Sequence, residues 1–94
     1  MQLRDINDFQ VAITYDLSTL EVEIKVKINV PILGSITIAK AKGNLKQGVS
    51  VHVGYKGIAS GEVGLKLKGS TVIVYWDLNA FGKALKDQIE LFSI

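Results

Sequence analysis

The chain has 94 residues, of which 48% are hydrophobic, and a formal net charge of +2, which fits one domain over residues 1–94 with a small core. It contains no cysteine, so disulfides, a thiolate nucleophile and cysteine-ligated metals are excluded. A chain without cysteine is compatible with oxidising and reducing compartments, so the localisation of the protein is not determined. No apolar run is long enough for a membrane-spanning helix, and the lysines are dispersed among acids beside one arginine, which argues against nucleic-acid binding.

Two neighbouring stretches alternate regularly between apolar and polar residues, over residues 9–16 and 20–30. Strict period-two alternation predicts strands that have one buried face and one solvated face. With residues 17–18 as a two-residue turn, Tyr15 would lie opposite Leu20. This register puts both apolar sets on one face, so the two strands are expected to form a hairpin.

Pro31 ends the second of these strands because proline cannot donate to a ladder, and a third strand is predicted over about residues 35–42. Its hydrophobic phase slips near Ala39, because Ile36 and Ile38 share a parity with Lys40. A one-residue β-bulge near Ala39 would restore the phase.

Three more strands are predicted over residues 49–55, 59–67 and 71–79, with Trp76 facing the core. Residues 69–70, Gly-Ser, fit a two-residue hairpin turn that has glycine at its first central position. If Leu67 pairs with Val72 across this turn, Gly64 lies opposite Tyr75, whose ring can cover the bare backbone.

The last segment, residues 80–94, fits either a seventh strand after a loop at 81–83 or a short helix, and we favour the strand. Glycines within or beside the strands, such as Gly61 and Gly64, indicate strong curvature. The predicted fold is therefore all-β, an antiparallel meander of six or seven strands curved into a small barrel or a sandwich.

The chain carries no motif for a known reaction. Its single histidine, His52, lies within a predicted strand, and there is no serine elbow or phosphate loop. Glu21 and Glu23 share a strand face without further ligands at a suitable spacing. We therefore expect no enzymatic activity, no cofactor and no metal site.

One group of polar residues comes together when the fourth, fifth and sixth strands are paired. His52 then faces Glu62, Glu62 faces Asp77, and Tyr75 lies two positions further along the same face. An imidazole beside two carboxylates can transfer protons, bind a cation or hydrogen-bond a sugar. The alternative is a solvated cross-strand pair, with Asp77 pointing elsewhere. These four are the candidate ligand-binding residues.

The predicted function is a non-enzymatic binding or self-associating β-sheet module. One alternative is a carbohydrate-binding, lectin-like domain that uses the four candidate residues, and another is a small barrel that binds an apolar ligand. By parity, Ile36, Ile38 and Ile73 fall on the second face of the sheet. A small domain gains from burying such residues against a copy of itself, so a homo-oligomer is expected.

Overall fold

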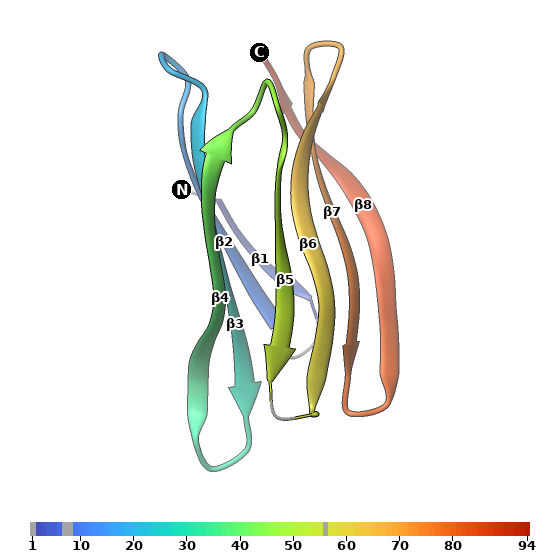
Figure 1. Cartoon of the computed structure of the whole chain (residues 1–94). Helices are drawn as coiled ribbons and strands as arrows, with labels where there is room; N and C mark the ends of the chain where they lie inside the picture. Colours follow the sequence, from blue (N-terminus) through green and yellow to red (C-terminus); the bar gives the residue numbers. More distant parts are fainter. Residues whose placement is uncertain (1, 7–8, 56) are drawn as a thin grey trace.

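The computed structural model describes residues 2–6, 9–55 and 57–94, and the side chains from residue 9 onward within these ranges. The described chain is built from eight strands (Figure 1). In chain order they are β1 (Gln2–Ile6), β2 (Phe9–Asp16), β3 (Glu21–Val30), β4 (Gly34–Asn44), β5 (Val49–Tyr55), β6 (Ala59–Lys68), β7 (Thr71–Ala80) and β8 (Lys83–Ser93). Nowhere in these ranges is there a helix that could cross a bilayer.

The strands form two four-stranded antiparallel sheets, β1–β4 and β5–β8, in which each strand pairs with the next along the chain (Figure 1). Both sheets contribute to one core, where Ile24 of β3 and Val63 of β6 are fully buried. The rings of Tyr15 on β2 and Phe92 on β8 lie 4.9 Å apart and join the two sheets. The predicted all-β meander is confirmed, and it is arranged as a sandwich of two sheets, without closure into a barrel.

The predicted register of the β2–β3 hairpin is wrong by two residues. Tyr15 pairs with Val22 instead of Leu20, because the turn contains the four residues 17–20. Asp16 stabilises this longer turn: its Oδ1 accepts hydrogen bonds from the backbone N and the Oγ of Ser18, at 2.9 and 2.6 Å. Its carbonyl oxygen accepts a hydrogen bond from the Leu20 N at 2.7 Å. A shift of two residues leaves every side chain on its predicted face.

The bulge predicted near Ala39 is confirmed. Val26 pairs with Ala39 and Lys27 with Thr37, which leaves Ile38 as the extra residue of β4. The bulge restores the hydrophobic phase, because it lets Ala39 lie opposite the fully buried Val26.

The isoleucines expected on a second apolar face are already covered within one chain. Ile36 lies opposite the buried Ile28, and both Ile36 and Ile38 are half-buried against the core. Ile73 does lie on the outer face of β7, between Lys66 and Glu90, but only 3% of it is exposed. The described side chains therefore do not form the exposed apolar face from which the homo-oligomer was predicted. The homo-oligomer itself stays a prediction.

The second sheet follows its predicted pairing. Leu67 lies opposite Val72 across the Gly69–Ser70 turn, where Gly69 has a φ of 63°. Trp76 is buried in the core, as expected. Residues 83–93 form the strand β8, which confirms the strand over the helix, and β1 is an eighth strand that the sequence pattern did not indicate.

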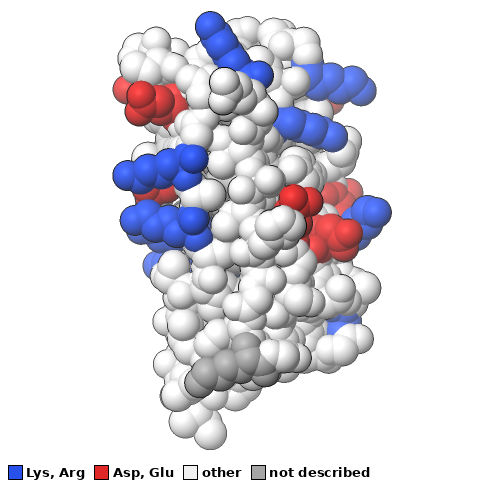
Figure 2. All heavy atoms as spheres, viewed as in Figure 1, with Lys and Arg blue, Asp and Glu red and all other residues white. Residues whose placement is uncertain are grey.

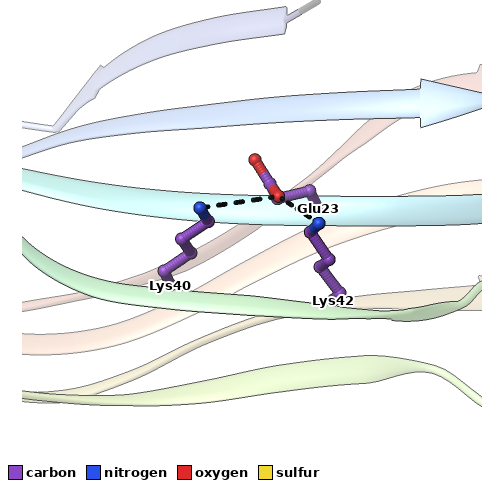
Figure 3. Close-up of polar contacts among 3 residues, drawn as sticks. All are labelled: Glu23, Lys40 and Lys42. Carbon is purple, nitrogen blue, oxygen red and sulfur yellow. Dashed lines mark ion pairs between the residues drawn. The ribbon is translucent and has the colours of Figure 1, made fainter.

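The outer face of the first sheet is rich in lysine. Lys25 lies directly opposite Lys40, and like charges at such positions repel. Glu23 offsets this repulsion: its Oε2 lies 4.0 Å from the Lys40 Nζ and 3.5 Å from the Lys42 Nζ (Figure 3). The lysines remain largely exposed, so this cluster contributes little to stability.

Candidate functional site

The outer face of the second sheet carries the four candidate residues. On β6, Val63 points into the core, so the neighbouring Glu62 points outward. The strand register places His52 opposite Glu62 and Glu62 opposite Asp77, as the sequence predicted. β8 extends this row with Lys86, which lies opposite Asp77. One row across four strands thus presents an imidazole, two carboxylates and an ammonium group.

A second row lies next to the first and is organised by Tyr75. It consists of Ser50, Gly64, Tyr75 and Gln88, one from each strand of the sheet. The phenol ring lies directly against Gly64, because a Cβ added at that glycine would collide with the Cζ and Oη of Tyr75. The Lys66 Nζ lies 5.5 Å from the centre of the ring and 3.4 Å from the Gln88 Oε1. Glycine at position 64 therefore leaves room for the end of the aromatic ring against β6.

The two rows border an open hollow of about 710 Å³. Three of the four predicted residues, Glu62, Tyr75 and Asp77, line it. His52 belongs to the first row but is not part of the lining. The lining also includes six polar side chains that sequence reasoning did not select: Gln47, Ser50, Lys66, Lys86, Asp87 and Gln88. In Figure 2, acidic atoms gather on the side of the molecule where β6–β8 lie, with lysines around them.

The polar groups of the first row remain open to solvent. His52 and Asp77 are exposed and Glu62 is half-buried. Within residues 9–55 and 57–94, no hydrogen bond or ion pair joins these three side chains. No three His, Asp or Glu side chains among the described residues lie close enough together to hold a metal ion. The carboxylates of Glu62 and Asp77 are therefore two separate hydrogen-bond acceptors along the hollow.

Three of the residues that were missed, Lys86, Asp87 and Gln88, come from β8, whose conformation the sequence left undecided. Phe81 and Gly82 form a two-residue turn that pairs Ala80 with Lys83. Once this turn is known, alternation alone places Lys86 and Gln88 on the outer face. The available signal was Gly82, since glycine is favoured at the second central position of such turns.

No family model matches the chain, and no curated protein or solved structure is significantly similar to it.

Proposed function

We propose that the chain is a non-enzymatic binding module and that its ligand, a carbohydrate, binds in the hollow lined by Glu62, Tyr75 and Asp77. The observation that carries the proposal is the Tyr75 ring, whose hydroxyl end lies directly against Gly64, in a hollow that carboxylates and an amide also line. A sugar has an apolar ring face that stacks on an aromatic side chain, and hydroxyl groups that donate to carboxylates. Both kinds of group are present within one hollow.

Lys66 does not prevent stacking on Tyr75. Its ammonium group lies over the ring, but Lys66 is exposed. A cation–π contact at an exposed site is worth only about 0.5–1 kcal/mol, so a sugar ring can displace it. Once displaced, the Lys66 ammonium and the Gln88 amide can hydrogen-bond the sugar hydroxyls.

A surface ligand is favoured over an apolar ligand held inside a barrel. Packed side chains from both sheets, including Trp76 and Leu78, occupy the space between the sheets. The hollow at Tyr75 and a second hollow beside Tyr15 both open to the solvent. Polar ligands, with hydroxyls that replace water, suit such open sites.

The experiment is a glycan array followed by titration of the best sugar against the wild-type chain and three variants. We expect Tyr75→Ala and Asp77→Asn each to weaken binding by about tenfold or more, as is typical when a stacking or charged hydrogen-bonding partner is lost. Glu21→Gln removes a carboxylate from the exposed face of the other sheet and should leave the affinity unchanged. The proposal would be refuted if neither Tyr75→Ala nor Asp77→Asn weakened binding, or if the chain bound no glycan on the array.

Self-association is a second candidate, favoured by the free edge of β8. Within the described strands, β8 pairs only with β7, so its other side presents unpaired backbone groups. A strand from a second copy can extend the sheet there. Sedimentation analysis should then show a mass that rises with concentration, whereas a monomer mass at every concentration would contradict this candidate.

A further inference from the structure

Three non-glycine residues in the described chain have a positive φ, namely Leu20 at 64°, Ile32 at 75° and Phe81 at 51°. Leu20 gains compensating contacts: it is half-buried against the core, and its carbonyl oxygen accepts a hydrogen bond from the Leu45 N at 2.9 Å. Ile32 and Phe81 are instead exposed. The backbone strain at Ile32 is therefore not offset by packing within the chain, and the strain at Phe81 is offset only in part.

Ile32 and Phe81 are both residue types that are disfavoured at their positions in the turns. Ile32 is β-branched, and a β-branched side chain rarely adopts a left-handed backbone conformation. Phe81 and Gly82 form a two-residue turn with positive φ at both positions, where the first position favours Asn, Asp or Gly. Asparagine would form both turns with less strain. Turn formation alone therefore does not explain why apolar side chains occupy these two turn positions.

These side chains lie at the same end of the sandwich. The β3–β4 turn carries Ile32, which is fully exposed, and Leu33, which is 64% exposed; the β7–β8 turn carries Phe81, which is 45% exposed. Figure 1 shows both turns at the lower end of the molecule. The Phe81 N also donates a hydrogen bond of 3.1 Å to the Ile58 carbonyl oxygen, which ties the β7–β8 turn to the β5–β6 turn. We call Ile32, Leu33 and Phe81 the apolar end.

Charged side chains are scarce among the described residues at this end. Among the described residues of these turns, at 31–33, 57–58 and 81–82, none is charged, and Lys83 directly follows the last of them. The lower part of the face in Figure 2 is largely white, whereas lysines and acids are spread over its upper part. Among the described residues, the apolar end thus combines protruding aliphatic and aromatic side chains with an adjacent cation, Lys83.

We propose that the apolar end inserts into the surface of a lipid bilayer, with Lys83 at the level of the lipid headgroups. Apolar tips beside a cation suit the boundary between acyl chains and anionic headgroups. A second copy fits less well, because the end of the sandwich is small. The two shorter dimensions of the molecule, 20 and 17 Å, give this end a cross-section of roughly 340 Å². Each partner in a standard protein interface buries about 800 Å² of accessible surface, which is more than twice as much.

The test is flotation of the full chain with vesicles of phosphatidylcholine, alone or with about 30 mol % phosphatidylserine. The wild-type chain should float with the anionic vesicles, and the double variant Ile32→Asn/Phe81→Asn should bind them at least tenfold more weakly. Asparagine suits a left-handed turn position, so the double variant should keep or raise the melting temperature of the wild type. Lys83→Gln should weaken binding to anionic vesicles about fivefold, with little effect on neutral ones.

The matched control is Leu17→Asn, which removes an exposed apolar side chain from the turn at the opposite end of the sandwich. It should float as the wild type does. The proposal is overturned if the wild-type chain stays with neither kind of vesicle, or if the folded double variant floats equally well. It is also overturned if the wild-type chain does not float but forms a dimer that the double variant loses, because a second copy then covers the apolar end.

Discussion

Ile24→Ala tests the core on which the two sheets depend. Ile24 is fully buried at the middle of β3, between Ile13 on β2 and Ala41 on β4. The substitution removes three carbon groups, each worth about 0.8 kcal/mol of transfer free energy, or about 2.4 kcal/mol in total. The cavity left behind raises the expected loss of unfolding free energy to about 3–4 kcal/mol.

Urea denaturation followed by Trp76 fluorescence measures this loss, because Trp76 is buried in the same core. In a domain of this size the melting temperature should fall by about 12 to 30 °C. Ile32→Ala is the control: it makes the same chemical change at a fully exposed position, where it also relieves the strain of a β-branched residue at a positive φ, so it should not lower the unfolding free energy. A loss below about 1 kcal/mol for Ile24→Ala, or equal losses for both variants, would refute the assignment of this core.

Four further predictions concern the turn, the glycines and the lysine-rich face. The Ser18 side chain and backbone hydrogen bonds hold the pKa of Asp16 below its ordinary value of 3.8, so the stability from this turn is present above pH 3.8 and is lost as the pH falls through the lower folded pKa. An NMR titration should show Ser18→Ala raising the pKa of Asp16 toward 3.8, and an unchanged pKa would contradict the assigned cause. Gly61→Ala should destabilise the fold by roughly 1–3 kcal/mol in urea denaturation, because Gly61 has a φ of 135° and a new Cβ would collide with the Asp77 carbonyl oxygen. Gly64→Ala displaces only the end of the Tyr75 ring, so it should cost less stability than Gly61→Ala while weakening sugar binding, and the reverse order would show that the ring is fixed elsewhere. Glu23→Gln should lower the unfolding free energy by less than about 1 kcal/mol, and an effect that persists at high salt would rule out the exposed ion pairs as its source.

Alternation of residue types determined much of the second sheet. Because side chains on a strand point to opposite faces in turn, the pattern assigned Trp76 to the core and Tyr75 to the outer face. The Gly69–Ser70 turn then fixed the pairing of β6 with β7, so Gly64 was correctly placed opposite Tyr75. The bulge beside Ala39 was also predictable, since only an extra residue restores the hydrophobic phase of β4.

The same alternation could not decide the register of β2 with β3. A shift of two residues leaves every side chain on the same face, so pairing Tyr15 with Leu20 or with Val22 satisfies the pattern equally well. The hydrogen bonds from Ser18 to Asp16 stabilise the longer turn, and the alternation of residue types does not reveal them.

Contacts between distant parts of the chain decided the rest. Residues 80–94 were compatible with a strand or a helix, and pairing with β7 made residues 83–93 the strand β8. The two sheets pack around one core, and this packing half-buries Ile36 and Ile38. It also brings the ring of Tyr15 into contact with the ring of Phe92. A period-two pattern in the sequence indicates which face of a strand is buried. Which other sheet covers that face depends on long-range packing, and only the tertiary structure contains it.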